Sequence, residues 1–194
     1  FYEIENEGVI AKSRNFAISK SKGKYLAFLD SDDWWSPDKL KKTNYYINQG
    51  YNFLYHDMYI SKKRNFIKRK TSYCRKLKKP IYNDLIYNGP AFPTSSVTLN
   101  KEIFDKTGKF NEEVNLITWE DYDAWINFSK VNENFFKIPG ILGHIKIDEE
   151  NLLNLDMQID NIYKCINQLT AVFSNPRVAS TMSQHPTFPQ QQKM

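Results

Sequence analysis

Blocks of apolar residues separated by polar turns predict alternating helices and strands in the first third of the chain. Val9–Ser21 has helical composition and ends before Gly23, a residue type favoured just past a helix end. Tyr25–Leu29 is a short, continuous apolar run, the pattern of a strand buried on both faces, as in a parallel sheet. A second such run, Tyr51–Tyr55, indicates another strand of the same sheet.

A helix is predicted between these two strands. Ser36-Pro37-Asp38 supplies an N-cap, a proline at the first helical position and an acid in the first turn. The helix would run to Gln49 and close at Gly50. Strand, helix and strand in this order are typical of a βαβ unit, so the sequence predicts an α/β protein with a mixed sheet.

Further elements follow in the second half of the chain. Ser95–Leu99 has strand composition, and Asn100 can cap a short helix over Lys101–Lys106 that Gly108 ends. Thr118-Trp119-Glu120-Asp121 opens a helix through about Lys130, with Trp125 and Phe128 on its apolar side.

The C-terminal part divides into two regions of different composition. Apolar residues recur at helical spacing from Ile159 to Phe173, which predicts an amphipathic helix. From Ser174 onward the sequence is rich in Ser, Pro and Gln and cannot build a core. We therefore divide the chain into an α/β domain over residues 1–150, an amphipathic helix over 151–173 and a flexible tail over 174–194.

The composition of the chain excludes several classes of protein. With 194 residues, 41% of them hydrophobic and 25% charged, the chain is a globular domain and not a collagen-like, coiled-coil or wholly disordered protein. Its two cysteines cannot form a disulfide framework and there is no CxxC pair, so we expect a reducing, cytoplasmic environment. No apolar run approaches the roughly 18 residues of a spanning helix, and the acidic start is unlike a signal peptide.

Positive charge is concentrated in one stretch. Residues 61–80 contain ten Lys and Arg and no acid, while the formal net charge of the whole chain is +5. A nucleic-acid binder would spread its positive charge over a face, so a nucleic-acid partner is not expected. The basic stretch is either a solvated surface loop or a contact for anionic lipid headgroups or a lipid-diphosphate acceptor, which would place the protein peripherally at the inner membrane face.

Candidate chemistry begins with Asp30-x-Asp32-Asp33, directly after the first predicted strand. In open α/β sheets ligands bind beyond the carboxyl ends of strands. Three neighbouring carboxylates repel one another, and a divalent cation relieves that repulsion while binding phosphate oxygens. The pattern therefore predicts a metal and diphosphate site, with an ordinary Asp-rich turn as the alternative.

Two sets of motifs follow one another along residues 6–130. The first set is Asn6-x-Gly8, Ala11-x-x-Arg14-Asn15, Ala17-Ile18, Lys22-Gly23-x-Tyr25-Leu26-Ala27-Phe28-Leu29-Asp30-Ser31-Asp32-Asp33 and Pro37-x-x-Leu40. The second set is Ser95-Ser96-Val97, Phe104, Gly108, Phe110-Asn111-Glu112 and Trp119-Glu120-Asp121-Tyr122-Asp123-x-Trp125. In this order they resemble the donor-side and acceptor-side motifs of GT-A-fold, family 2 glycosyltransferases.

The resemblance implies a mainly parallel mixed sheet flanked by helices, and transfer of a sugar with inversion from a nucleoside diphosphate donor to a hydroxyl. Family members begin with two strands that hold the nucleobase. This sequence starts after both, so we expect a partial GT-A domain. The implied partners are a UDP-sugar donor and a saccharide or lipid-linked acceptor of bacterial surface glycan synthesis, and the implied cofactor is Mn²⁺ or Mg²⁺.

Site residues follow from the same resemblance. Arg14, Asn15 and Asp30 are expected near the donor nucleotide, and Asp32 with Asp33 and Asp30 at the metal. Asp121 is the expected catalytic base, with Glu120 as a supporting acid or acceptor contact. From its spacing alone, Asp121 also fits a helix cap, whose position at a helix N-terminus would lower the pKa of its carboxyl.

Several aromatic and histidine residues leave their role open. Trp34, Trp35 and Trp119 could form an apolar sugar platform or pack in the core. His144, beside a predicted strand, could be a metal or phosphate ligand or a structural residue. Competing functions are a metal-dependent nucleotidyltransferase, which the missing glycine-rich phosphate loop disfavours, and a non-catalytic module that binds RNA or membrane through the basic stretch.

Overall fold

The computed structural model of the chain describes residues 2–62, 70–72, 74–114 and 119–147. All of these lie in the first of two units, Phe1–Leu153. The second unit, Asn154–Met194, lies outside the described residues, as do the amphipathic helix expected over 151–173 and the tail expected over 174–194.

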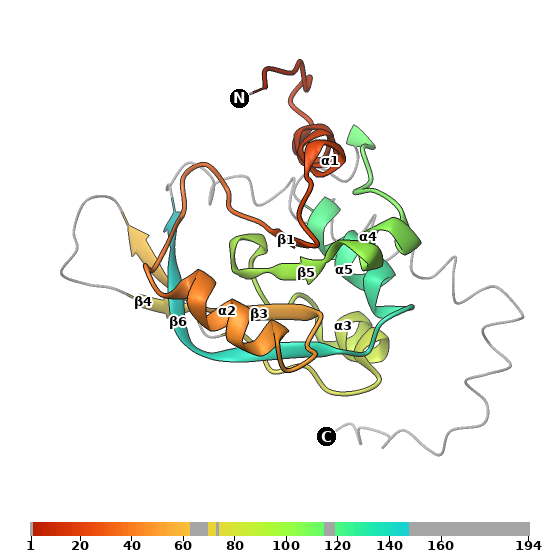
Figure 1. Ribbon diagram of the computed structural model, residues 1–194. Helices are drawn as coiled ribbons and strands as arrows, with labels where there is room; N and C mark the ends of the chain where they lie inside the picture. The colour runs from red at the N-terminus through yellow and green to blue at the C-terminus, as the bar shows by residue number, and fades with distance from the viewer. Residues whose placement is uncertain (1, 63–69, 73, 115–118, 148–194) are drawn as a thin grey trace, which may run out of the picture. The chain divides into compact units, whose positions relative to one another are not determined.

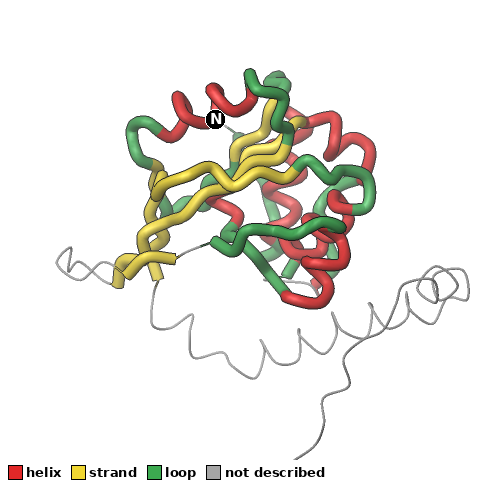
Figure 2. Tube along the Cα trace, turned by 90° about the horizontal axis from the view of Figure 1, so that it is seen from below, coloured by secondary structure: helices red, strands yellow, loops and turns green. Residues whose placement is uncertain are grey.

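In the described part of the chain, six strands form one sheet with helices on both sides (Figures 1 and 2). The strands are β1 (Tyr25–Ala27), β2 (Trp34–Trp35), β3 (Phe53–Lys62), β4 (Lys70–Ser72), β5 (Thr98–Asn100) and β6 (Phe135–Ile147). The helices are α1 (Ile10–Lys20), α2 (Lys39–Ile47), α3 (Ile81–Asn88), the 3₁₀ turn η1 (Thr94–Ser96), α4 (Lys101–Thr107) and α5 (Glu120–Ser129). This confirms the expected α/β fold class.

The order of strands is β1-β5-β3-β6-β2, with β4 paired to β3. Among the described strands only β3 and β6 pair in parallel, whereas the resemblance implied a mainly parallel sheet. The strands β1 and β3 do flank α2, but β5 lies between them and pairs antiparallel with both. The βαβ unit therefore has a strand inserted from a distant part of the sequence.

The pattern of burial along the strands corrects one expectation. Leu26 in β1 is buried while Ala27 is exposed, so this strand is not buried on both faces as its apolar composition suggested. The strand β3 does have that character. Phe53 and Leu54, which point to opposite faces, are both 0% exposed.

Each face of β3 is covered by different helices. Leu54 packs with Ile138 and Leu142 in a cluster that also contacts Tyr46 and Ile47 of α2. On the other face, the Phe53 ring lies edge-on to Trp125 of α5, with ring centroids 5.5 Å apart. Trp125 and Phe128 are buried, which confirms the predicted apolar side of α5.

The predicted helix and strand ends agree with the structure at α4 and differ from it at α2 and β5. Asn100 caps α4 by accepting a hydrogen bond from the Glu102 amide, and α4 ends at Gly108, whose φ is 94°. In contrast, α2 begins at Lys39 and not directly after Ser36, since residues 36–39 form a turn in which the Lys39 amide donates to Ser36 O, and Asp38 is the N-cap residue. The predicted strand over Ser95–Leu99 is shorter, since Thr94–Ser96 forms the η1 turn.

Candidate active site

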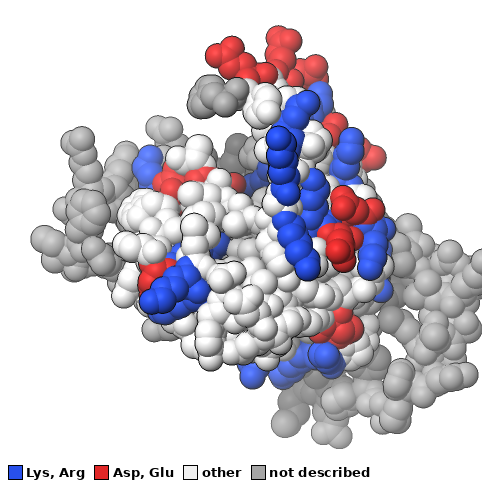
Figure 3. All heavy atoms as spheres, in the orientation of Figure 1, with Lys and Arg blue, Asp and Glu red and all other residues white. Residues whose placement is uncertain are grey.

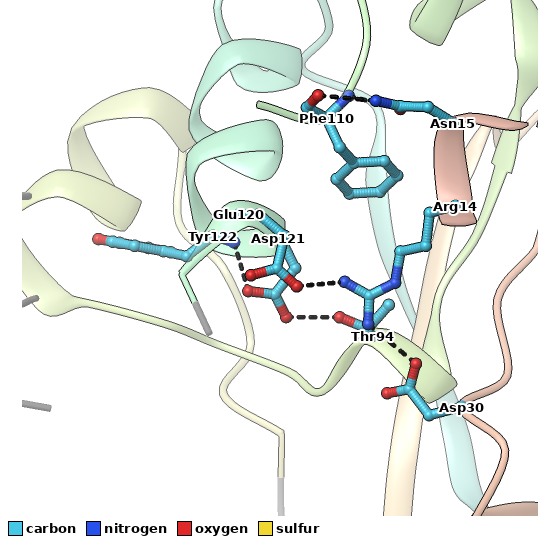
Figure 4. Close-up of polar contacts among 8 residues, drawn as sticks. All are labelled: Arg14, Asn15, Asp30, Thr94, Phe110, Glu120, Asp121 and Tyr122. Carbon is cyan, nitrogen blue, oxygen red and sulfur yellow. Dashed lines mark hydrogen bonds and ion pairs between the residues drawn. The ribbon is translucent and has the colours of Figure 1, made fainter. Parts of the chain in front are cut away.

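Arg14 connects the two acidic motifs of the sequence. From α1, its guanidinium reaches Asp30 Oδ1 at 2.9 Å, just after β1, and Glu120 Oε1 at 2.6 Å, at the start of α5 (Figure 4). Burial alone would lower the pKa of Arg14, but the carboxylates of Asp30 and Glu120 raise it above its ordinary value. The ion pairs therefore hold residues 14, 30 and 120 together as one charged cluster.

Asp121 lies beside this cluster and is held by two hydrogen bonds. Its Oδ2 accepts from Thr94 Oγ1 at 2.5 Å and its Oδ1 from the Tyr122 amide at 2.6 Å. Burial raises the pKa of Asp121, and the hydrogen bond from Thr94 and the charge of Arg14 offset part of that rise. The expectation that the helix N-terminus would lower this pKa is wrong, because desolvation outweighs the favourable contacts. A carboxylate with a raised pKa is a stronger proton acceptor.

Glu120, the neighbour of Asp121 in the chain, is buried. Its side chain is 6% exposed, and its second oxygen, Oε2, has no hydrogen-bond partner among the described residues. Burial and the nearby Asp121 carboxylate raise the pKa of Glu120, against the charge of Arg14. The carboxyl groups of Glu120 and Asp121 therefore share the Arg14 guanidinium as their positively charged neighbour.

The acidic loop after β1 is organised by its neighbours. Asp33 Oδ1 accepts from the Lys146 amide at 3.0 Å. The backbone amide of Asp33 donates to Asp30 O in a tight turn. Burial raises the pKa of Asp33, and the carboxylates of Asp32 and Asp30 raise it further, against hydrogen bonds from Ser95 and Lys146. The three carboxyl groups are thus close enough to repel one another.

The fit of this loop to a divalent cation is partial. Among the described residues no group of three or more His, Cys, Asp and Glu side chains converges as a metal site. Asp30 is engaged by Arg14, which leaves Asp32 and Asp33. Two carboxylates suffice for Mg²⁺ when substrate phosphates complete its coordination. The loop therefore fits a cation that is bound jointly with a diphosphate.

Asn15 lies apart from this cluster, on the far side of the Phe110 ring in Figure 4. The Asn15 side chain donates to Phe110 O and accepts from the Phe110 amide, both at 2.9 Å. It also donates to Glu112 Oε1 at 2.8 Å. These contacts tie α1 to the segment after α4. They give Asn15 a structural task, while its expected place at the donor nucleotide stays a prediction.

Two cavities lie next to these charged residues. One of about 870 Å³ is lined by α1 and β1 and reaches Arg14, Asp30 and Asp32. The other, of about 190 Å³, is lined by Asp121 together with Pro90, Phe92, Trp119, Tyr122 and Trp125. A volume of 300–1,000 Å³ is usual for a small-molecule site, and the first cavity falls in that range.

The remaining aromatic and histidine candidates pack against other side chains. Trp34 stacks on His144 with ring centroids 4.7 Å apart, and His144 also contacts Tyr59. Trp35 donates from Nε1 to Ser95 O at 2.8 Å. Trp119, which lines the smaller cavity, is the tryptophan of the three that lies next to Asp121.

Positive side chains are not confined to the basic stretch. Figure 3 shows Lys and Arg gathered on the face near α1 and α4, interleaved with Asp and Glu. Residues 63–69 and 73 lie outside the described part of the chain. Of the described part of this stretch, Lys62 ends β3 and Lys70–Ser72 forms β4, which pairs antiparallel with β3. In the described residues no helix is long and apolar enough to cross a membrane.

Comparison with known proteins decides the family. The model of glycosyl transferase family 2 matches residues 2–108, more than half of the chain. The chain belongs to glycosyl transferase family 2. The matched region includes Arg14 and the acidic loop and ends before Glu120 and Asp121.

Three relatives illustrate this membership. The chain is 30% identical over 117 residues to UDP-Glc:alpha-D-GlcNAc-diphosphoundecaprenol beta-1,3-glucosyltransferase WfaP of Escherichia coli, covering 60% of this chain and 43% of WfaP. It is 54% identical over 41 residues to the putative teichuronic acid biosynthesis glycosyltransferase TuaG of Bacillus subtilis, covering 21% of this chain and 16% of TuaG. The uncharacterized glycosyltransferase MJ1057 of Methanocaldococcus jannaschii is 30% identical over 131 residues, covering 63% of this chain and 42% of MJ1057.

Solved structures show the same GT-A fold. The crystal structure of S. aureus TarS 1-349 matches with a TM-score of 0.57 and 18% identity, covering 75% of this chain and 42% of TarS. TarS in complex with UDP-GlcNAc also matches with a TM-score of 0.57, at 18% identity, covering 73% and 40%. The chain of this family 2 protein spans less than half the length of these relatives.

Proposed function

We propose that this protein is an inverting glycosyltransferase that moves a sugar from a UDP-sugar to a hydroxyl of a saccharide or lipid-linked acceptor in bacterial surface glycan assembly. The observation that carries the proposal is the bridge from Asp30 through Arg14 to Glu120. It brings the acidic loop after β1 and the acidic start of α5 to one site, although 90 residues separate these motifs in the sequence.

The names of the relatives support the choice of donor and acceptor. WfaP is named for transfer from UDP-Glc to a sugar on diphosphoundecaprenol, and TarS has been crystallised with UDP and UDP-GlcNAc. WfaP and the putative TuaG are both named for work on bacterial cell-surface glycans or their lipid-linked precursors.

The residues divide the proposed reaction between the two cavities. The donor diphosphate would lie in the larger cavity at Asp32, which Asp33 follows in the chain, and the acceptor sugar in the smaller one against Trp119. Asp121 takes the proton of the acceptor hydroxyl as its oxygen attacks the anomeric carbon. The bond from that carbon to the diphosphate then breaks on the opposite face, which inverts the configuration. The ion pair of Glu120 and Arg14 lies beside Asp121, and the charge of Arg14 favours its ionised form.

A divalent cation, Mn²⁺ or Mg²⁺, would be held by Asp32 and Asp33 and would supply charge neutralisation for the departing diphosphate. Asp30 would act nearby as a donor contact through its pair with Arg14. The carboxylates need to be ionised for this, so binding should weaken as the pH falls through the raised pKa of Asp33.

Nucleotide binding tests the donor site. Calorimetric titration with UDP, GDP and dTDP, each with and without Mn²⁺, should show metal-dependent binding of UDP to the wild type. Asp32→Ala should lose at least about tenfold in affinity, whereas Asp105→Ala, an exposed acid on α4, should bind like the wild type. Absence of binding by every nucleotide, or equal affinity in Asp32→Ala, would contradict the proposed donor site.

The catalytic base has a separate test. Asp121→Asn should abolish transfer and leave UDP affinity nearly unchanged, because the amide keeps the shape of the carboxylate but cannot take a proton. Asp123→Asn, two residues further along α5 and hydrogen-bonded to Asn127, is the matched control and should remain active. Full activity of Asp121→Asn would rule out the role of base.

The basic stretch over 61–80 is proposed as a peripheral membrane contact. Ten Lys and Arg without an acid among them support the proposal, and Lys70 at one end of the charged triplet lies in β4, which pairs with β3. Each base near an anionic surface contributes about 1 kcal/mol. Sedimentation with phosphatidylglycerol vesicles should therefore decrease when Lys68, Arg69 and Lys70 are replaced by Ser, and unchanged sedimentation would refute the contact.

A further inference from the structure

The turn η1 lies between the two acidic motifs of the site. Its residues Thr94, Ser95 and Ser96 are 3%, 0% and 1% exposed. The turn leads directly into β5, the strand that pairs with both β1 and β3. A buried turn of three small polar residues needs partners for its hydroxyl groups.

The hydroxyl groups of two successive residues reach opposite sides of the site. Thr94 Oγ1 donates to Asp121 Oδ2 at the start of α5. Ser95 Oγ accepts from the Asp30 amide at 3.0 Å, and its side chain also hydrogen-bonds the Asp33 carboxylate. One short turn therefore contacts the candidate base and the acidic loop at the same time.

The back of the turn is braced by buried side chains. The Ser95 carbonyl accepts from Trp35 Nε1 at 2.8 Å. Behind Trp35, the Lys39 amine lies 3.9 Å from the ring centroid and donates to Thr98 Oγ1 at 2.8 Å. Lys39 is completely buried, so this support is part of the packed interior.

We infer that Thr94 and Ser95 are positioning residues that hold the base and the acidic loop at a fixed separation. The inference rests on the proposed function, in which Asp121 and the diphosphate site must act on one anomeric carbon. Reacting atoms must approach within about 3–3.5 Å, and a misplacement of about 1 Å can lower a rate on the order of a hundredfold. The two hydroxyl groups have separable tasks, one for each half of the site.

Three substitutions in the same turn separate these tasks. Ser95→Ala should raise the KM for the UDP-sugar and weaken UDP binding about tenfold, because the acidic loop loses its anchor. Thr94→Val should lower kcat by about tenfold or more with little change in UDP affinity. Ser96→Ala is the matched control, since Ser96 is equally buried but its Oγ donates to Pro93 O within the turn.

Two further readouts do not depend on catalysis. In Thr94→Val, a ¹³C-detected titration should show the pKa of Asp121 rising above its wild-type value, because a hydrogen bond to the ionised form is lost. Thr94→Ser keeps the hydroxyl and should restore the wild-type titration. In Ser95→Ala, the Asp30 amide should exchange with solvent faster than in Ser96→Ala, because its acceptor is removed.

The outcomes distinguish this inference from the proposed function. If the wild type binds no nucleotide, the proposed function fails, and the titration and exchange measurements still decide whether the turn holds both acidic motifs. If Ser95→Ala and Ser96→Ala behave alike, or if Asp121 titrates identically in Thr94→Val and the wild type, the inference is overturned.

Discussion

The buried lysine of α2 makes a strong prediction about stability. Lys39 is 0% exposed, and no carboxylate pairs with it in the described part of the chain. Burial lowers the pKa of Lys39 from 10.5 to about 7. In the unfolded chain the amine stays protonated up to about pH 10.4. Between these values the unfolded state binds more protons, so the stability of the fold should rise with pH.

The size of the effect follows from the same two values. Each pH unit over which the two states differ by one proton is worth about 1.36 kcal/mol. Between pH 6 and pH 10 the contribution of Lys39 therefore amounts to roughly 4 kcal/mol. Below pH 7 both states are protonated and the contribution is level.

Substitution by methionine isolates this contribution from other groups that titrate in the same range. Urea unfolding of the wild type and Lys39→Met should be followed by tryptophan fluorescence at several pH values from 6 to 10. The variant should be the more stable protein at pH 6, because its buried side chain carries no charge. The difference in the free energy of unfolding should then shift by roughly 4 kcal/mol in favour of the wild type by pH 10.

The control is Lys41→Met, which changes an exposed lysine on the same helix. Its difference from the wild type should stay nearly constant with pH. If the difference between the wild type and Lys39→Met changes by less than about 1 kcal/mol over this range, the burial of a titrating amine at this position is refuted.

Two more predictions concern the interior around β3 and β6. Burial lowers the pKa of His56 to about 4, so the free energy of unfolding should fall by roughly 3 kcal/mol as the pH drops from 6.5 to 4. His56→Gln should flatten that fall in urea titrations, and an unchanged slope would contradict the prediction. A Cβ on Gly143 would lie 2.8 Å from Met58 Cε and 3.2 Å from Trp34 O, so Gly143→Ala should cost about 1–3 kcal/mol in thermal unfolding. The double variant Gly143→Ala with Met58→Ala should lose less stability than the sum of the two single losses, because the clash is absent from it. Strictly additive losses would argue against the clash.

Local signals in the sequence located α1, α2, α4 and α5 and the start of β3, which was expected over Tyr51–Tyr55 and runs over Phe53–Lys62. The N-cap Asn100 and the left-handed Gly108 define α4 because both act within one turn of the helix. The apolar side of α5 follows from periodicity alone. At α2 the same kind of signal misled, since Ser36 opens a turn and the helix begins after Asp38.

The parts that the sequence could not supply depend on contacts between distant residues. No local pattern places β5 between β1 and β3, and this insertion makes both pairings antiparallel. The acidic residues at positions 30–33 and 120–121 were identified as motifs, but the bridge between them runs through Arg14. Thr94 gave no signal at all, because its bond to Asp121 spans 27 residues.

The insertion of β5 has a consequence for the order of folding. Among the described residues β1 pairs with β5 alone, and Ala27 meets Thr98. When the chain is made by a ribosome, the partner of β1 emerges about 70 residues later, a delay of roughly 4 to 14 s at 5–20 residues per second. Until then the backbone of the apolar run after α1 lacks its β5 partner. The position of one three-residue strand therefore sets the earliest time at which β1 can join the sheet during synthesis.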